Sequence, residues 1–144
     1  MRHSSVIEIS AGRRLLEITA DEFEGRSISH PLFGLLVWYL KKRGAVCFTT
    51  GLLIRQRMGK QYELENDHIF PFSRLKKEGY GKENRFKYAL AQELTNRAIL
   101  TKLANRTKSA MDAAVYLQSV EARFPNALTL QCVPTDSELW RIEN

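Results

Sequence analysis

The longest apolar run of this chain sets the first limit on how it folds. Residues 31–40 read PLFGLLVWYL, about half of the roughly 20 residues that a helix needs to cross a bilayer. The run therefore predicts a buried core helix and no membrane span. Ser29 is a capping residue just before Pro31, and Gly44 is a typical stop, so we expect a helix from Pro31 to about Lys42.

The length of 144 residues suits one compact domain and is too short for two ordinary ones, so we expect a single domain over 1–144. The first residues lack an apolar leader with a small-residue cleavage site, which favours a cytoplasmic protein. Thr135 and Glu138 have capping-box spacing, yet the helix they announce has six residues before the sequence ends. We therefore expect this sequence to be a fragment of a longer protein.

Positive charge is concentrated in one quarter of the chain. The whole sequence has a net charge of +6, while residues 73–109 hold 10 Lys or Arg against 3 Glu. The remainder of the chain is therefore close to neutral. A cationic cluster of this kind favours an anionic partner such as nucleic acid.

The two cysteines stand far apart in the sequence. Cys47 and Cys132 form no Cys-x-x-Cys pair, so a structural zinc site is not expected. We expect both side chains to be core thiols.

The rest of the chain predicts short strands mixed with helices. Residues 5–10 and 15–19 alternate weakly like a hairpin, although residues 19–23 also fit a helical turn. Other strands are expected at 45–50, 62–69 and 96–101, and residues 74–87 form a polar stretch with a glycine turn at 79–81. Helices are expected from the capping residue Asn84 to about Glu93 and over 105–120. The predicted class is α+β, and residues 62–120 follow the order strand, loop, strand, helix.

One constellation of polar residues is specific. Asp67-His68-Ile69-x-Pro71 is followed by Asn96 and then by Asn105-Arg-Thr-Lys108. These residues resemble the HNH endonucleases, also called ββα-metal or His-Me finger nucleases. The resemblance implies a catalytic core over about residues 60–120, with additional N-terminal and C-terminal helices. In it, the strand ending at Asp67-His68 pairs with the strand starting near Asn96, and the helix near Asn105 packs against both.

A wider resemblance covers about residues 20–140. Ser29-His-Pro-Leu-Phe-Gly-Leu-Leu, Thr50-Gly-Leu, residues 62–75 and residues 96–117 look like the C-terminal nuclease domain of GmrSD-type modification-dependent restriction proteins. This implies restriction of foreign or modified DNA, beside an N-terminal nucleotide-hydrolysing domain or subunit that lies outside this chain. The sequence has no Gly-rich phosphate loop, so we expect this domain to need no nucleotide.

The hydrolysis of a phosphodiester needs a proton acceptor and a bound cation, and the residues of this motif can supply both. A histidine can accept a proton from the attacking water near neutral pH, which suits His68. A hard cation such as Mg²⁺ or Mn²⁺ stabilises the leaving oxygen and prefers oxygen ligands, which Asp67 and Asn105 supply. In the family resembled, the residue at the position of Asn96 steadies the histidine by hydrogen bonding.

Strand geometry raises one difficulty. Asp67 and His68 are neighbours, so their side chains should point to opposite faces of a strand. Either a distortion at Pro71 or a metal held at the strand edge has to bring both to one phosphate. Glu65 shares the face of Asp67; we expect an exposed carboxylate there, with a supporting role behind the metal ligands as the alternative.

The cations near the motif are candidates for DNA contact. Lys108 follows Asn105 by three residues and should share its helix face. The other candidates are Arg106, Lys102, Arg97, Lys76, Lys77 and Lys82, although a run of charges is also typical of a solvated surface. The alternative function is a catalytically inactive DNA-binding module with the same fold. Motif integrity argues against it, since no expected catalytic position is substituted.

Overall fold

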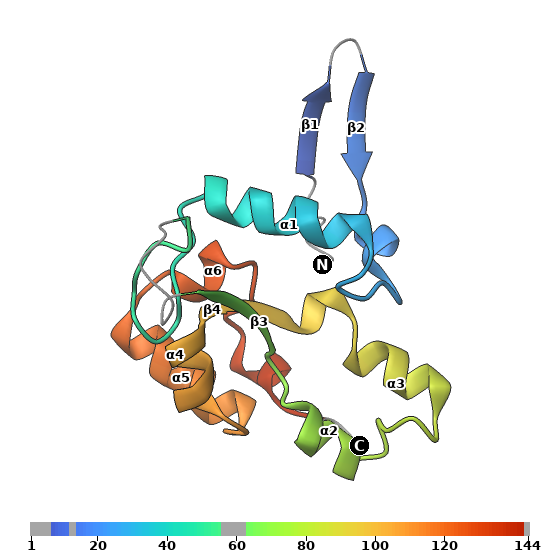
Figure 1. Cartoon of the computed structure of the whole chain (residues 1–144), viewed down its shortest axis with the longest axis vertical. Coiled ribbons are helices and arrows are strands. Elements are labelled where there is room, and N and C mark those ends of the chain that lie inside the picture. Colours follow the sequence, from blue (N-terminus) through green and yellow to red (C-terminus); the bar gives the residue numbers. More distant parts are fainter. Residues whose placement is uncertain (1–6, 12–13, 56–62, 143–144) are drawn as a thin grey trace.

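The computed structural model describes residues 7–11, 14–55 and 63–142, and these form an α+β structure. A hairpin of β1 (Ile7–Ala11) and β2 (Arg14–Ile18) stands apart from the body, whereas β3 (Leu64–His68) and β4 (Arg97–Thr101) pair antiparallel in its centre (Figure 1). The helices are α1 (Pro31–Lys42), α2 (Phe72–Lys77), α3 (Arg85–Ala91), α4 (Lys102–Lys108), α5 (Ala113–Arg123) and α6 (Ala127–Leu130). Short 3₁₀ helices are η1 (Ala20–Phe23), η3 (Leu94–Asn96) and η4 (Ser137–Trp140). In the described ranges, no helix is long and apolar enough to cross a membrane.

The apolar run forms α1 over the predicted residues. Its cap is His30 and not Ser29: the His30 Nδ1 atom accepts from the Leu32 amide at 3.2 Å, while the Ser29 hydroxyl bonds to Ser27. The helix stops before Gly44, whose φ of +76° suits glycine. Phe33, Leu36 and Leu40 pack on the core, whereas the outward Trp38 is 50% exposed.

Strand β4 is the centre of the core because it is buried on both faces. Ala98 and Leu100 pack toward α5 and α6 in one apolar cluster. Ile99, between them, points the other way and packs with Leu40 of α1 and Ile54. This period-two alternation places β4 between two apolar layers, and β3 is held in place through its pairing with β4.

The backbone of β4 that does not pair with β3 is completed by a buried glutamine. Gln131 is 4% exposed. Its Oε1 accepts from the Ile99 amide at 2.8 Å, and its Nε2 donates to the carbonyls of Ile99 at 2.8 Å and Val46 at 2.9 Å. One side chain thus satisfies three backbone groups, two of them in buried hydrogen bonds with Ile99.

We expect Gln131→Met to lower the free energy of unfolding by about 1–3 kcal/mol, the cost of leaving buried polar groups unpaired. The substitution keeps the volume and removes only the amide. Gln118→Met is the matched control, because Gln118 is exposed on α5. Urea denaturation of both variants checks the prediction; equal midpoints would show that Gln131 does not secure β4.

Three predicted segments differ from the observed structure. Residues 45–50 form no strand: Val46 makes a single bridge with Leu53, and residues 48–50 turn. Residues 74–77, expected in the polar stretch, belong to α2, which starts directly after Pro71 and buries Leu75. The expected capping box of Thr135 is not made; Asp136 caps the short η4 instead, accepting from the Glu138 amide at 3.0 Å.

The helix expected over 105–120 is two helices. α4 begins earlier, at Lys102, because the Thr101 hydroxyl accepts from the Ala104 amide at 3.2 Å. It ends at Lys108, before Ser109, whose φ is +48°, and α5 starts after the capping residue Asp112. Met111 lies between the two helices and is exposed.

The cysteine prediction is half right. Cys47 is fully buried, but Cys132 is exposed and wrong as a core thiol. Its backbone φ of +59° places it in a turn after α6. Arg43 lies close to its sulfur, at 3.7 Å.

Candidate functional site at the end of strand β3

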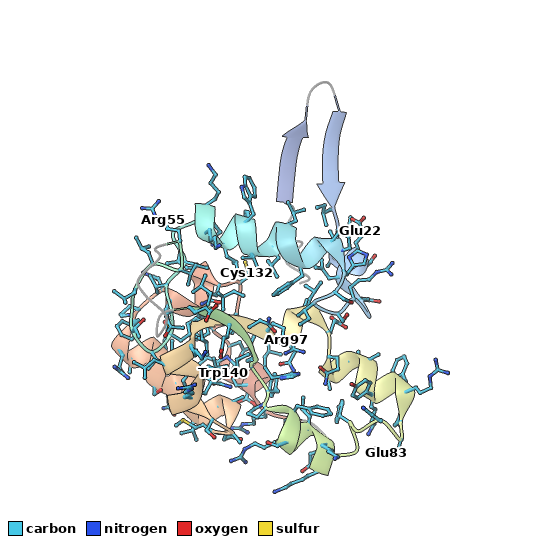
Figure 2. All side chains as sticks on the ribbon, in the orientation of Figure 1. Glu22, Arg55, Glu83, Arg97, Cys132 and Trp140 are labelled. Atoms are coloured by element: carbon cyan, nitrogen blue, oxygen red, sulfur yellow. The ribbon has the colours of Figure 1, made fainter. Side chains whose placement is uncertain are left out.

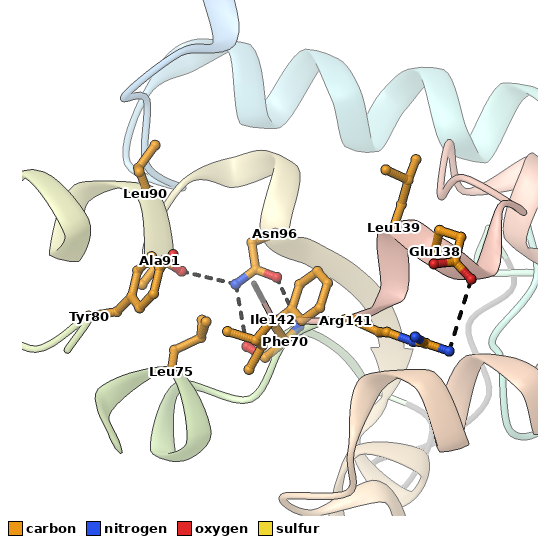
Figure 3. A pocket seen from close by; sticks show the side chains of 10 residues that line it. All are labelled: Phe70, Leu75, Tyr80, Leu90, Ala91, Asn96, Glu138, Leu139, Arg141 and Ile142. Atoms are coloured by element: carbon orange, nitrogen blue, oxygen red, sulfur yellow. Dashed lines mark hydrogen bonds and ion pairs between the residues drawn. The ribbon is translucent and has the colours of Figure 1, made fainter. Parts of the chain in front are cut away.

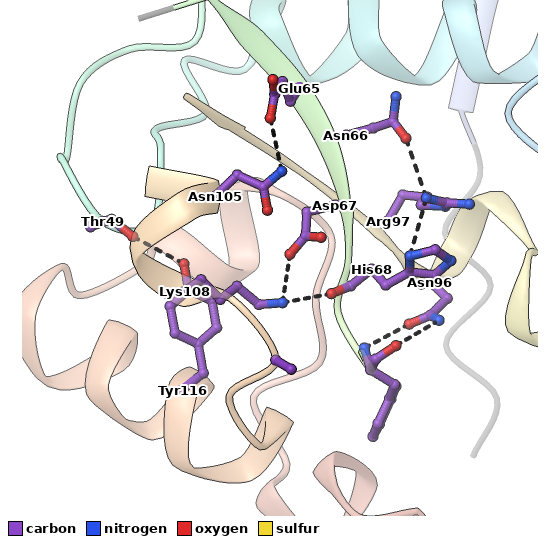
Figure 4. A network of polar contacts seen from close by, with 12 residues as sticks. Thr49, Glu65, Asn66, Asp67, His68, Asn96, Arg97, Asn105, Lys108 and Tyr116 are labelled. Atoms are coloured by element: carbon purple, nitrogen blue, oxygen red, sulfur yellow. Dashed lines mark hydrogen bonds and ion pairs between the residues drawn. The ribbon is translucent and has the colours of Figure 1, made fainter. Parts of the chain in front are cut away.

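The Asp67-His68 motif occupies the last two positions of β3. Asp67 pairs with Ala98 and His68 with Arg97 across the ribbon. Alternation places the side chains of Glu65 and Asp67 toward α4, and that of His68 on the opposite face (Figure 4). The strand is regular through His68, so no distortion brings the two motif side chains to one face.

The α4 side of β3 gathers oxygen atoms. Asn105 Nδ2 donates to Glu65 Oε2 at 2.8 Å, which fixes the amide so that its oxygen lies on the side of Asp67 (Figure 4). Glu65 is half-buried, so the expectation of an exposed carboxylate is wrong. Its contact with Asn105 is compatible with the alternative of a supporting role. The carboxylate of Asp67 remains 20% exposed.

Lys108 lies on this same side and is buried, with 2% of its side chain exposed. Its Nζ donates to Asp67 Oδ2 at 2.6 Å and to the His68 carbonyl at 2.7 Å. The ammonium also lies 5.3 Å from the centre of the Tyr116 ring. The side chain expected to meet a phosphate is therefore turned onto protein oxygens.

Tyr116 completes the surroundings of this ammonium. Its hydroxyl bonds to the Thr49 hydroxyl at 3.1 Å. Burial raises the pKa of Tyr116 to about 12, so the phenol stays neutral at any working pH. Tyr116 therefore interacts with Lys108 as an uncharged ring, through a cation–π contact and not as a phenolate.

The opposite face of β3 holds the histidine ring. Arg97 lies 3.4 Å from His68 Nδ1, and because a guanidinium only donates, Nδ1 must accept. His68 Nε2 then carries the proton and donates to Gln92 Oε1 at 3.2 Å, which also accepts from Arg97 at 2.9 Å. The ring stacks on Phe72 with centroids 5.8 Å apart. One tautomer and one orientation are thereby fixed.

The environment keeps this imidazole neutral. Burial lowers the pKa of His68, and the positive charge of Arg97 lowers it further. At neutral pH the ring is therefore a proton acceptor with its lone pair at Nδ1. That is the state a general base requires.

Asn96 supports the turn after the motif and does not bond to the histidine ring. Its Oδ1 accepts from the Phe70 amide at 2.9 Å, and its Nδ2 donates to the carbonyls of Ala91 at 3.1 Å and Phe70 at 3.4 Å. Figure 3 shows it lining a cavity of about 400 Å³ with Leu75 and Leu90. The partner of the ring is Gln92, which no sequence signal marks.

The candidate DNA-binding cations are dispersed. Arg97 lies beside His68, near the centre of the molecule, whereas Glu83 marks the outer tip of the α2–α3 segment (Figure 2). That segment carries the exposed residues Lys76, Lys77 and Lys82. On α4, Arg106 is exposed and Lys102 lies 3.9 Å from Glu63. The structure thus separates a central arginine from two outer groups of cations.

Asp67 and Asn105 offer a carboxylate and an amide oxygen, which are ligand types that a hard cation prefers. Within the described ranges, no three His, Cys, Asp or Glu side chains converge as a metal cluster. The charge is already partly balanced, because Lys108 neutralises Asp67. A metal ion at this place meets a carboxylate that is already paired with an ammonium.

Comparisons of the chain with protein-family models, with curated proteins and with solved structures found no match.

Proposed function

We propose that this chain is a metal-dependent HNH endonuclease that hydrolyses DNA phosphodiester bonds. The observation that carries the proposal is the arrangement of β3, β4 and α4. This antiparallel ribbon with a helix against it gathers Asp67, His68 and Asn105 around one strand end. Strand β3, strand β4 and helix α4 follow one another in the chain order that a ββα-metal core implies, which supports the proposal. The partner of the His68 ring is Gln92 in place of the expected Asn96.

The outer edge of β3 offers one place where side chains on both faces of the strand can meet the same phosphate. β3 pairs with β4 alone in the described structure, so its other edge has no strand beside it. A phosphate that approaches this edge can meet Asp67 from one face and His68 from the other. This favours the strand-edge arrangement over a distortion at Pro71.

The neutral imidazole and the guanidinium have complementary roles. His68 accepts the proton of the attacking water at Nδ1, the nitrogen that faces Arg97. Arg97, freed from this contact, donates to a phosphate oxygen next to that nitrogen. Gln92 holds the opposite ring nitrogen and keeps the tautomer.

The metal side of the site is formed by Asp67 and Asn105. Bound Mg²⁺ or Mn²⁺ would supply charge stabilisation for the leaving oxygen. Glu65 orients the amide of Asn105 so that its oxygen is presented to the ion. The resemblance to GmrSD-type proteins further favours restriction of foreign or modified DNA, with a separate nucleotide-hydrolysing domain or subunit as partner.

A second candidate is a catalytically inactive DNA-binding module. The observation in its favour is Lys108, which neutralises the one carboxylate assigned to the metal. Incubation of supercoiled plasmid with the purified chain decides between the two. The nuclease predicts nicked or linear product with Mg²⁺ and none with EDTA; intact plasmid in both conditions, with DNA bound, would favour the inactive module.

We expect the combined Lys76→Ala, Lys77→Ala and Lys82→Ala variant to bind any duplex more weakly. These exposed lysines lie in the segment that holds the excess positive charge. Each lost phosphate contact should reduce the slope of log K against log salt by about 0.9. Fluorescence anisotropy at several salt concentrations, in the His68→Ala background, measures both quantities.

The control for this variant is Lys41→Ala with Lys42→Ala, at the end of α1 and outside the basic segment. An unchanged slope in the triple variant would assign those lysines to a solvated surface. The path of the DNA would then move toward Arg97, Lys102 and Arg106.

A further inference from the structure

We propose that the ammonium of Lys108 and a divalent cation compete for the carboxylate of Asp67. Metal binding then expels Lys108 from the cage formed by Asp67, the His68 carbonyl and the Tyr116 ring. The inference deepens the metal dependence of the proposed function and rests on it for its consequence. The competition itself involves only metal and protein. It can therefore be measured without DNA.

The groups around the Lys108 ammonium suit a single positive charge. An ammonium has three donors, and two of those of Lys108 reach oxygen atoms at 2.6 and 2.7 Å, distances typical of charge-assisted hydrogen bonds. The ring of Tyr116 faces the same ammonium at 5.3 Å. Lys108 is thus the resident cation on this side of β3.

A divalent cation on Asp67 conflicts with this arrangement. The Nζ atom already contacts one carboxylate oxygen of Asp67, so the ion would lie within a few ångströms of a like charge in a poorly hydrated place. Repulsion at such distances is strong where the effective dielectric constant is low. The ammonium has a flexible four-carbon stem and can leave, whereas Asn105 is held by Glu65 and stays.

The consequence is an exchange of cations. When the ion binds, Lys108 turns out of the cage, beside the same strand end and near any phosphate bound there. This unites two observations about Lys108: its position three residues after Asn105 suits a phosphate contact, yet its ammonium is buried on Asp67. The lysine holds the site closed to metal until the ion outcompetes it.

The first experiment removes the competing charge. Lys108→Met keeps the length of the side chain, and Lys108→Arg keeps the charge. We expect calorimetric titration with Mg²⁺ to show at least about tenfold tighter binding to Lys108→Met than to the parent chain or to Lys108→Arg. Equal affinity in the parent and Lys108→Met, or no Mg²⁺ binding to folded Lys108→Met, would overturn the proposal.

The second experiment uses the parent chain and applies even if Lys108→Met does not fold. Acetylation of lysine amines by an activated ester, followed by mass spectrometry, reports how accessible each amine is. We expect Lys108 to be protected without metal and to react severalfold faster as Mg²⁺ is raised, while Lys42 on α1 keeps its rate. Protection of Lys108 that Mg²⁺ leaves unchanged would overturn the exchange.

The two proposals fail separately. A chain that exchanges Lys108 for Mg²⁺ but leaves plasmid intact upholds the exchange and contradicts the nuclease. A chain that cuts plasmid with Mg²⁺ while Lys108 stays protected upholds the nuclease and contradicts the exchange.

Discussion

Replacing His68 by alanine is expected to slow plasmid cleavage by about 10²–10⁴-fold, the contribution of a positioned general base. The ring is held in one tautomer with a lone pair at Nδ1 at neutral pH. Its neutral form is favoured because burial and Arg97 both lower the pKa of His68. Initial rates of nicking under saturating Mg²⁺ measure the loss.

Two controls separate this loss from damage to the fold. DNA affinity of His68→Ala, measured by anisotropy, should stay close to that of the parent chain, because the phosphate contacts assigned to Arg97 and the outer lysines remain. His30→Ala removes the cap of α1, away from β3, and should cost about 1 kcal/mol of stability with no change in rate. Parent-like cleavage by His68→Ala would show that another residue is the base.

The elements that sequence predicts best are those with local signals. α1 has an apolar run between a capping position and a glycine, and β3 has an alternating pattern that ends before Pro71; both appear as predicted within a few residues. The helix after Asn84 is also confirmed, with Asn84 Oδ1 accepting from the Lys87 amide. Capping and periodicity act over three or four residues, which is the range that sequence reasoning covers.

The incorrect predictions concern segments whose conformation depends on contacts with distant parts of the chain. Ser109 takes a positive φ between α4 and α5, although no glycine marks the break. Residues 45–50 have strand-forming side chains but, within the described ranges, make only the bridge of Val46 with Leu53. The side chain of Gln131 bonds to both Val46 and Ile99, the position where a strand paired with β4 would lie. Intrinsic β-propensity is weak against such contacts.

The candidate site shows the same division. The motif residues and their strand positions follow from the sequence, including the opposite faces of Asp67 and His68. The contacts of Gln92 with His68 and of Lys108 with Asp67 span 24 and 41 residues. No local pattern encodes them, so only the fold reveals a histidine held by a glutamine and a carboxylate held by a lysine.

The second large effect concerns Asp67→Asn, which keeps the shape of the side chain and removes its charge. We expect the affinity for Mg²⁺ or Mn²⁺, measured by calorimetric titration, to fall below detection. The reason is that Asp67 is the only carboxylate assigned as a metal ligand. Asn105→Ala should weaken binding from the helix side. The sequence alone predicts that metal affinity falls more than stability, but Asp67 is also the counter-charge of a buried ammonium.

Asp67→Asn should therefore also lower the free energy of unfolding by about 3 kcal/mol, the lower end of the range for breaking a buried ion pair. The lower end applies because asparagine still accepts a hydrogen bond and Asp67 is 20% exposed. Urea denaturation without metal measures the change. A loss within error of zero would show that Lys108 does not depend on this carboxylate.

Adding Lys108→Met to Asp67→Asn separates the two roles of the carboxylate. With both charges gone, no buried ion lacks a partner, so the double variant should recover most of the lost stability. Metal binding should not recover, since the ligand is still missing, whereas Lys108→Met alone should bind Mg²⁺ more tightly than the parent chain. Stability would then depend on whether Asp67 and Lys108 are both present or both absent. Metal affinity would depend on whether Asp67 carries a charge that no ammonium balances. A double variant as unstable as the sum of the single variants would mean that the two residues do not interact, and that the 2.6 Å contact adds nothing to the fold.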